Sequence, residues 1–388
     1  MPAPTTDPRA AAPGSLYLGL ISGTSADGID AALVRFEPQL NVIAAHTAVY
    51  SDALRKRVLA LATSDAAIAL DDFGRLDVEI GAAFGAAARS LLQAAGIDPD
   101  AVVAIGSHGQ TVCHRPHGAH PFSLQIGDPS VIAERSGILT VADFRCADVA
   151  AGGQGAPLLP ALHAAVFADP EIARAILNLG GIANVTVLAP GCEVLGFDTG
   201  PANCLLDAWA VRHLGTVRDH NGAWAKSGRV DRSLLANWLA DPYFAAAPPQ
   251  STGREVFNLD WLDARLPESL APADVQASLL HLSARSIAEA IRAHGRGTRE
   301  VYACGGGVHN AMLMDALRAE LPGVPVETTA ALGLDPDYVE AVGFAWLARA
   351  RLLGESGNLP SVTGARGPRL LGAIYPAGGS APSLPTSR

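Results

Sequence analysis

A recurring strand–turn–strand pattern constrains the fold of this chain more than any other feature. Residues 16–36 read LYLGLISGTSADGIDAALVRF, in which two apolar runs flank a turn rich in glycine and hydroxyl groups. The same layout of strand, glycine turn and strand returns at residues 175–188, roughly 160 residues later, which is about the length of one domain. The repeat predicts a duplicated α/β architecture with a ligand held in the cleft between its two halves.

The first turn, residues 22–28, can present backbone N–H groups and hydroxyls to phosphate oxygens. It is not a Walker loop, because the G-x-x-x-x-G-K-[ST] pattern and any nearby lysine are missing. An ordinary glycine-containing hairpin explains this segment equally well. A third glycine turn at 305–307 follows a predicted strand at 300–303 and precedes a predicted helix at 311–321. Three such turns in this order favour a nucleotide-phosphate site over unrelated tight connections.

Two further predicted strands end in polar residues. A predicted buried strand at 101–106 is followed by His108 and Gln110, and a predicted strand at 138–142 is followed by Asp143 and Asp148. Ligands of open α/β sheets bind at the carboxyl ends of the strands, so these side chains are site candidates. Helices are predicted at 52–62, 70–95 and 158–167.

Asp198 is the strongest candidate for a catalytic residue. It lies in G-F-D-T-G-P-A-N, where a strand at 193–197 is predicted to end and a helix at 202–213 to begin, with Pro201 in its first turn. A carboxylate there can take a proton from an attacking hydroxyl or water. The alternative is that Asp198 only caps the helix or its turn.

Charge and composition exclude several classes of protein. A net charge of -10 argues against a nucleic-acid-binding surface, which needs clustered cations. An acidic protein that binds a polyphosphate needs a divalent cation. The five cysteines are scattered, no signal peptide is recognisable and no apolar run reaches membrane-spanning length, so a cytoplasmic protein without a membrane partner is expected. Residues 1–15 are expected to form a flexible leader, and residues 376–388 a flexible tail.

Other polar residues leave alternatives open. The spacing of His108, His114, His117 and His120 does not favour a zinc site, although His108 suits either a contact with a sugar hydroxyl or a buried structural position. Magnesium ligands cannot be chosen from the sequence among four carboxylates, which are Asp27, Asp30, Asp143 and Asp148. Glu340 reads as an acid in the first turn of a helix.

Together these motifs closely resemble, in order and content, the anhydro-N-acetylmuramic acid kinases of bacterial peptidoglycan recycling. The resemblance covers residues 16–376. It rests on S-G-T-S-A-D-G-I-D at 22–30, S-H-G-Q-T at 107–111, A-D-F-R at 142–145, A-A-G-G-Q-G-A-P-L at 150–158, N-L-G-G-I-A-N at 178–184, F-D-T-G-P-A-N at 197–203, G-R-E-V-F-N at 253–258, C-G-G-G at 304–307 and E-A-V-G-F-A-W at 340–346.

The resemblance implies the duplicated actin/hexokinase/Hsp70-like fold around a central ATP cleft. It implies ATP and Mg²⁺ as cofactors, and hydrolytic opening of 1,6-anhydro-N-acetylmuramic acid with phosphorylation of O6. The first α/β domain is then expected at 16–142 with 345–375, and the second at 143–344. A homodimer is compatible with the resemblance.

The resemblance also assigns site residues. Asp198 matches the general base, which removes a proton from the water that attacks the anomeric carbon. The ATP-phosphate loop corresponds to Ser22, Gly23, Thr24, Ser25, Ala26, Asp27, Gly28 and Ile29, and the nucleotide site is completed by Gly180, Gly181, Gly305, Gly306 and Gly307. The substrate side is expected to include His108, Gln110, Asp148 and Glu340.

One departure from the family pattern bears on the substrate. Cys146 and Ala147 stand where family members carry arginine, so affinity for the lactyl carboxylate of the sugar is in question. This departure motivates a kinase of another sugar as an alternative. A non-catalytic sugar-sensing protein is a further alternative, against which the retention of Asp198 and of the complete turn at 22–30 argues.

Overall fold

A glycine turn joins two antiparallel strands at the start of each sheet, as the sequence predicts. The computed structural model describes residues 9–23, 25–62, 68–248, 250–267 and 269–378. Strand β1 (Leu16–Ser22) pairs with β2 (Gly28–Arg35), and β7 (Arg174–Leu179) pairs with β8 (Ile182–Leu188).

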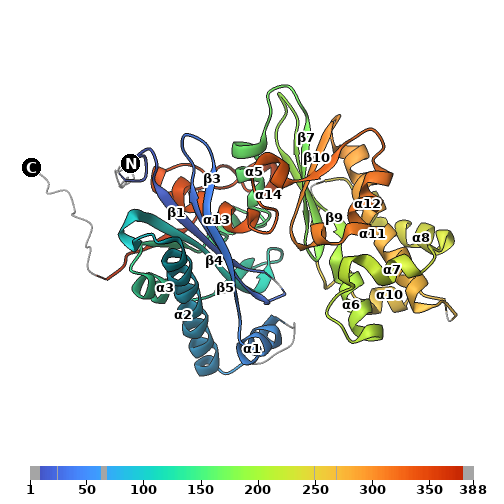
Figure 1. Cartoon of the computed structure of the whole chain (residues 1–388), viewed down its shortest axis with the longest axis horizontal. Coiled ribbons are helices and arrows are strands. Elements are labelled where there is room, and N and C mark those ends of the chain that lie inside the picture. The colour runs from blue at the N-terminus through green and yellow to red at the C-terminus, as the bar shows by residue number, and fades with distance from the viewer. Residues whose placement is uncertain (1–8, 24, 63–67, 249, 268, 379–388) are drawn as a thin grey trace, which may run out of the picture. The chain divides into compact units, whose positions relative to one another are not determined.

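The described residues form two compact units (Figure 1). The first unit contains the described residues up to Leu162 and those from Glu340 onwards, and the second contains His163–Val339. Among the described residues, none of the helices combines the length and the apolar character that crossing a membrane requires.

Each unit is built on one sheet. The first sheet has the order β12-β6-β4-β1-β2-β3, with β5 paired to β4. The second has the order β11-β10-β7-β8-β9. The remaining strands are β3 (Asn41–Val49), β4 (Val102–Arg115), β5 (Phe122–Ile126), β6 (Thr140–Ala142), β9 (Leu195–Pro201), β10 (Glu300–Cys304), β11 (Val326–Thr328) and β12 (Ala373–Tyr375).

The two sheets share one topology, which confirms the predicted duplication. In the first, β1, β2 and β3 are antiparallel neighbours, while β4 is parallel to β1 and β6 is parallel to β4. In the second, β7, β8 and β9 are antiparallel neighbours, while β10 is parallel to β7 and β11 is parallel to β10. The chain thus has the duplicated α/β fold of the actin/hexokinase/Hsp70-like class.

Helices pack on the sheets through apolar stripes. The helices are α1 (Asp52–Ala62), α2 (Leu70–Ala95), α3 (Pro129–Ser136), α4 (Cys146–Ala150), α5 (Leu159–Phe167), α6 (Asn203–Leu214), α7 (Ala223–Ser227), α8 (Arg232–Leu239), α9 (Pro242–Ala245), α10 (Leu259–Asp263), α11 (Pro272–His294), α12 (Ala311–Glu320), α13 (Val339–Leu353) and α14 (Pro360–Thr363). In α2, Leu76, Ile80 and Phe84 recur at helical spacing and are buried against the first sheet. In the second unit, α11 buries a similar stripe, and Figure 1 shows it beside α6 and α12.

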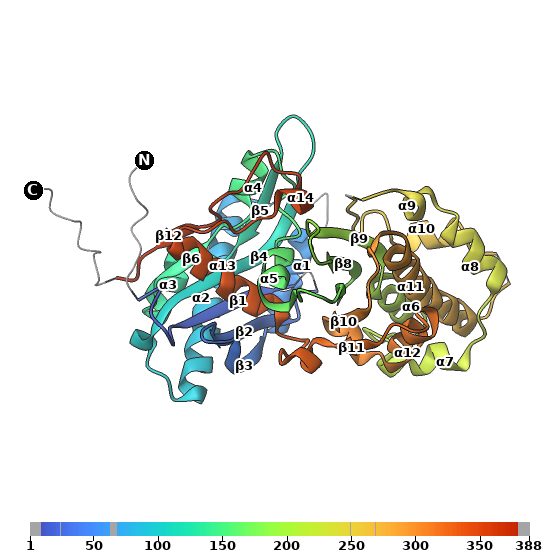
Figure 2. The same ribbon diagram turned by 90° about the horizontal axis from the view of Figure 1, so that it is seen from above.

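Helix α13 lies against β1 and β4 of the first sheet (Figure 2), and each of these two strands has a glycine at the point of closest approach. Gly19 of β1 and Gly106 of β4 are register partners. A Cβ atom at Gly19 would lie 1.7 Å from the carbonyl oxygen of Ala341, and one at Gly106 would lie 1.9 Å from that of Phe344. Leu18 and Leu20 point to the core on the other face, where α2 packs. The glycine pair therefore fixes how closely α13, with Glu340 in its first turn, approaches the sheet.

The expected domain boundary differs from the observed one. Residues 143–162 and 340–344, expected in the second domain, belong to the first unit. The reason is packing, because the Phe144 ring lies 5.7 Å from that of Phe344, and the backbone of α13 rests on β1 and β4.

Most predicted elements are confirmed. Helices α1 and α2 have the predicted bounds, and α5, α6 and α12 lie within a residue of theirs. Strand β4 is longer than predicted, so His108 and Gln110 lie inside it and not beyond its end. The expected leader and tail lie partly outside the described residues.

We predict that Gly106→Ala lowers the free energy of unfolding by about 3 kcal/mol or more, because the new methyl group would overlap the backbone of α13. The matched control is Gly74→Ala in α2, where an added Cβ meets nothing within 4 Å. That substitution should leave stability within about 1 kcal/mol of the wild type, on the stabilising side. Urea unfolding of both variants provides the measurement, and equal stabilities would contradict the assigned contact.

Candidate active site

Asp198 lies inside a strand and does not cap a helix. Strand β9 continues through Asp198 to Pro201, and Asp198 is the register partner of Asn184 in β8. Helix α6 begins only at Asn203, without a side-chain cap at Ala202. The predicted strand end at 197 and the placement of Pro201 in the helix are therefore wrong, because pairing with β8 extends the strand. The capping alternative for Asp198 is excluded.

A segment about 50 residues further along the chain holds Asp198 in place. The backbone N–H of Thr252 donates to Asp198 Oδ2 at 2.9 Å. The Tyr243 hydroxyl donates to the main-chain oxygen of Asp198 at 2.8 Å, and Gln250 Nε2 donates to the same oxygen at 3.1 Å. The Asp198 N–H in turn donates to the main-chain oxygen of Gln250 at 3.0 Å. Four hydrogen bonds thus fix both the backbone and the carboxylate of Asp198.

The environment of Asp198 suits proton transfer near neutral pH. Burial raises the pKa of its carboxyl to about 7, the Thr252 N–H opposes this rise, and the negative charge of Glu255 adds to it. A carboxyl with this pKa accepts and releases a proton readily at neutral pH, which is what a general base requires.

The second and third glycine turns lie together in the second unit. Gly305 and Gly307 both face the end of β7, since a Cβ at Gly305 would lie 2.4 Å from Asn178 Oδ1 and one at Gly307 would lie 2.6 Å from Leu179 Cβ. Asn203 Nδ2 donates to the carbonyl oxygens of Leu179 and Gly180 at 3.0 and 2.7 Å. These contacts place the second and third glycine turns next to each other within the second unit.

The carbonyl oxygens of the second turn bind the start of α6. The oxygen of Gly181 accepts from the N–H groups of Ala202 and Cys204, at 2.9 and 3.0 Å. The oxygen of Gly180 accepts from the N–H of Asn203 at 3.1 Å. These bonds consume backbone donors of the first helical turn and fix the position of the glycine turn.

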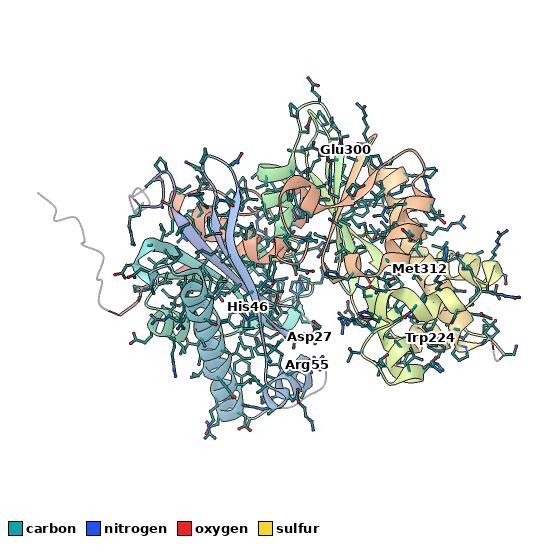
Figure 3. The ribbon with its side chains drawn as sticks, in the orientation of Figure 1. Asp27, His46, Arg55, Trp224, Glu300 and Met312 are labelled. Atoms are coloured by element: carbon teal, nitrogen blue, oxygen red, sulfur yellow. The ribbon has the colours of Figure 1, made fainter. Side chains whose placement is uncertain are left out.

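The side chains of Gln110 and Arg55 hold the backbone of the first glycine turn. Ser22 Oγ donates to Gln110 Oε1 at 2.6 Å, and Gln110 Nε2 donates to the oxygen of Gly23 at 3.2 Å. Arg55 of α1 pairs with Asp27 at 2.8 Å and donates to the oxygen of Ser25 at 3.3 Å, and Figure 3 shows Asp27 and Arg55 side by side. The turn is therefore anchored on both of its flanks.

The members of this turn differ in exposure. Gly23 and Ser25 are partly exposed, and a Cβ at Gly23 would meet only Ser25 Oγ, at 4.0 Å. The buried members are Ser22, Ala26, Gly28 and Ile29, and Asp27 is exposed. Thr24 lies outside the described residues.

His108, Arg145 and Glu340 form a chain of interactions in the first unit. Arg145 donates to His108 Nε2 through Nε at 3.1 Å and Nη2 at 2.9 Å, and His108 Nδ1 lies 3.0 Å from the oxygen of Gly109. Burial and the charge of Arg145 hold the pKa of His108 well below its usual value, so its ring is neutral. Burial also raises the pKa of Glu340, with Asp30 adding to the rise and Arg145 opposing it. Arg145 was not among the predicted site residues, although A-D-F-R is one of the resemblance motifs.

Two of the expected substrate-binding residues are engaged internally. Gln110 is buried and uses its amide to hold the first glycine turn. Asp148 is completely buried, where Oδ1 accepts from Asn358 Nδ2 at 2.6 Å and from Thr363 Oγ1 at 2.7 Å. Asp148 Oδ2 accepts from the N–H of Gly155 at 2.8 Å. The polar atoms of both side chains therefore already have partners within the first unit, and a sugar contact by either residue stays a prediction.

Residues 252–255, like Arg145, were not predicted as part of the site. Thr252 binds Asp198, Glu255 acts on its pKa, and Arg254 lies against Gly181. The signal was present in the motif G-R-E-V-F-N at 253–258, but no local feature linked it to Asp198.

We predict that Asp148→Ala lowers the free energy of unfolding by about 3 kcal/mol or more, since it leaves three buried donors without an acceptor. Asp315→Ala is the control, because Asp315 forms an exposed pair with Arg318 that contributes under about 1 kcal/mol. Thermal unfolding measures both effects, and similar melting temperatures would refute the structural role of Asp148.

Comparison with known proteins identifies the family of this chain. A family model described as anhydro-N-acetylmuramic acid kinase matches residues 15–377. The anhydro-N-acetylmuramic acid kinase of Xanthomonas oryzae pv. oryzae is 56% identical over 367 residues, covering 93% of this chain and 97% of the relative. Those of Xylella fastidiosa (53% identical) and Coxiella burnetii (50% identical) each cover 94% of this chain, and 97% and 98% of their own lengths are matched. The chain therefore belongs to the anhydro-N-acetylmuramic acid kinase family.

Proposed function

We propose that the protein is an ATP-dependent kinase that hydrolytically opens 1,6-anhydro-N-acetylmuramic acid and phosphorylates O6. The products are N-acetylmuramic acid 6-phosphate and ADP, in a reaction of peptidoglycan recycling. Membership of the family over residues 15–377 supports the activity. The observation that carries the mechanism is Asp198, whose carboxyl has a pKa of about 7 and accepts from the Thr252 N–H, while three further hydrogen bonds hold its backbone.

In the proposed reaction Asp198 is the general base. It takes one proton from a water molecule whose oxygen attacks the anomeric carbon C1. The bond between C1 and O6 breaks, and O6 leaves with its electron pair. O6 then attacks the γ-phosphorus of ATP, the bond from that phosphorus to the β,γ-bridging oxygen breaks, and ADP departs. Positioning of these groups supplies much of the rate enhancement in such a reaction.

The nucleotide phosphates are proposed to bind the glycine turns. In the first unit, Gly23 and Ser25 are the partly exposed described members of the turn, and their backbone is anchored by Gln110 and Arg55. In the second unit, Gly306 is exposed, and a Cβ there would meet nothing within 4 Å. Such open glycine backbone permits close approach of phosphate oxygens.

The sugar is proposed to bind near Glu340 and Arg145. Arg145 keeps its charge, since burial lowers its pKa only to about 10 and Glu340 opposes that fall. A partly buried cation of this kind suits the lactyl carboxylate of the substrate. Arg145 would then serve that group in the absence of the two arginines replaced by Cys146 and Ala147.

Mg²⁺ is proposed to arrive with the nucleotide. No cluster of three or more metal-ligating side chains occurs among the described residues, which fits an ion held mainly by phosphates and water. Asp30 and Glu340 are near enough for the charge of one to raise the pKa of the other, and a cation would relieve that repulsion. When bound, Mg²⁺ would neutralise charge on the phosphates.

The experiment that tests this function is incubation with ATP, Mg²⁺ and the anhydro sugar in ¹⁸O-labelled water. We expect ¹⁸O on C1 and phosphate on O6. Phosphate on an intact anhydro ring would contradict coupled hydrolysis. Turnover of a different sugar, without turnover of the anhydro sugar, would favour a kinase of another substrate.

Asp198→Asn is predicted to lower kcat by at least about 100-fold, because the amide cannot accept the proton of the attacking water. Binding of ATP and sugar should persist, since the backbone hydrogen bonds of residue 198 remain. The control is Asp260→Asn, which alters an exposed residue of α10 in the same unit. Steady-state kinetics and calorimetry provide the two readouts, and near-normal kcat would remove Asp198 from the role of base.

The pH dependence of kcat should reflect Asp198. The base acts when it is ionised, so kcat is predicted to fall as pH drops through about 7. Glu255→Gln removes the nearby negative charge, which lowers the pKa of Asp198 and moves this limb to lower pH. Glu289→Gln, which alters an exposed pair with Arg285, is the control and should leave the profile in place. Coincident profiles for all three proteins would contradict this electrostatic assignment.

A further inference from the structure

Arg254 is an exposed arginine whose guanidinium lies against the second glycine turn. A Cβ atom at Gly181 would lie 3.3 Å from Arg254 Nη2 and 3.4 Å from Nε, so a side chain at position 181 would press on the guanidinium. Burial raises the pKa of the Cys204 thiol to about 12, and the charge of Arg254 opposes this rise. The guanidinium is therefore near both the glycine turn and the start of α6.

The backbone that carries Arg254 is firmly anchored. The oxygen of Gly253 accepts from the N–H groups of Val256 and Phe257, at 3.1 and 3.0 Å. The Phe257 ring is buried, with its centroid 5.3 Å from that of Tyr243 and 5.2 Å from that of Trp261. On the other side, Thr252 is bonded to Asp198. Arg254 thus extends from a fixed turn between two anchors.

The backbone donors at the start of α6 are already used by the glycine turn. The N–H groups of Ala202, Asn203 and Cys204 donate to the oxygens of Gly180 and Gly181. These donors are therefore not free for an anion at this turn, whereas the guanidinium of Arg254 is a strong donor that faces the turn. Arginine presents a planar fork of N–H groups that matches a phosphoryl group.

The short separation of Arg254 from Thr252 along the chain indicates which phosphoryl group Arg254 contacts. Thr252 and Arg254 are two residues apart, so their Cα atoms are separated by about 7 Å at most. Thr252 holds the base, and the base acts on a sugar whose O6 receives the γ-phosphoryl group. This step rests on the proposed function. Of the three phosphates, the γ-phosphoryl group is thus the one near this segment.

We propose that Arg254 binds the γ-phosphoryl group of ATP at the Gly180–Gly181 turn and stabilises its charge during transfer. One rigid segment, residues 252–255, then orients the base and the transferred group together. Arg254 is on this account a catalytic residue, because its guanidinium would touch the group that is transferred.

The test compares binding of the β,γ-imido analogue of ATP with binding of ADP, both with Mg²⁺, by titration calorimetry of the full chain. Arg254→Ala is expected to weaken the analogue by about 10- to 100-fold, the range for a charge-assisted hydrogen bond, while ADP affinity is unchanged. Arg254→Lys, which keeps the charge without the fork, should give an intermediate loss. Arg232→Ala, at an exposed position of α8 in the same unit, is the control and should bind as the wild type does.

Two results would overturn the proposal. Equal losses for ADP and the analogue would show that Arg254 does not distinguish the γ-phosphoryl group, and unchanged affinity for both would leave Arg254 as a packing residue of the turn. Thermal unfolding of each variant separates a folding defect from a binding defect. Product analysis of the wild-type enzyme is read independently: failure to open the anhydro sugar would remove the proposed function, whereas the analogue-specific loss would still support the phosphate contact.

Discussion

The carbonyl oxygens of Ala341 and Phe344 occupy the space that side chains at positions 19 and 106 would need. This close approach of a helix backbone to two strands is the constraint on which the first unit depends. It returns the C-terminal part of the chain to the N-terminal sheet, and it brings Phe344 to within 4.6 Å of the His108 ring. It also puts Glu340 within electrostatic range of Arg145 and Asp30. Because Gly19 and Gly106 let the backbone of α13 come close to the sheet, charged and polar residues that are distant in sequence lie near one another.

In the second unit, the main constraint is the burial of the Asp198 carboxyl, which raises its pKa. Asp198 is held in β9 by bonds from Tyr243, Gln250 and Thr252, and these partners limit its contact with water. Burial and the charge of Glu255 together place its pKa near 7, a value that no exposed aspartate would have. The same short segment that supplies Thr252 and Glu255 also carries Arg254. In the proposed mechanism, this one segment therefore positions both the base and the transferred phosphoryl group.

The sequence predicted elements whose signals are local. Helices α1 and α2 have the predicted bounds because their apolar spacing and composition are continuous, and both hairpins follow from glycine between apolar runs. Strand β3 was not predicted, since it lies at the edge of the sheet and no residue in it is buried. Longer-range effects decided the site. The capping alternative for Asp198 stayed open at the sequence level, because its pairing with Asn184 and its bonds to residues 243–252 cannot be read from neighbouring positions. Asp148 looked like a ligand because its partners, Asn358 and Thr363, are more than 200 residues away.

The central claim is that the fold tunes Asp198 to act as a base, and titration of its own carboxyl group tests this most directly. Carbon-13 NMR of protein labelled at the aspartate carboxyl carbons, with Asp198→Asn identifying the signal, follows that group alone. The account predicts a midpoint near pH 7. A midpoint near 4, the ordinary value for aspartate, would contradict it.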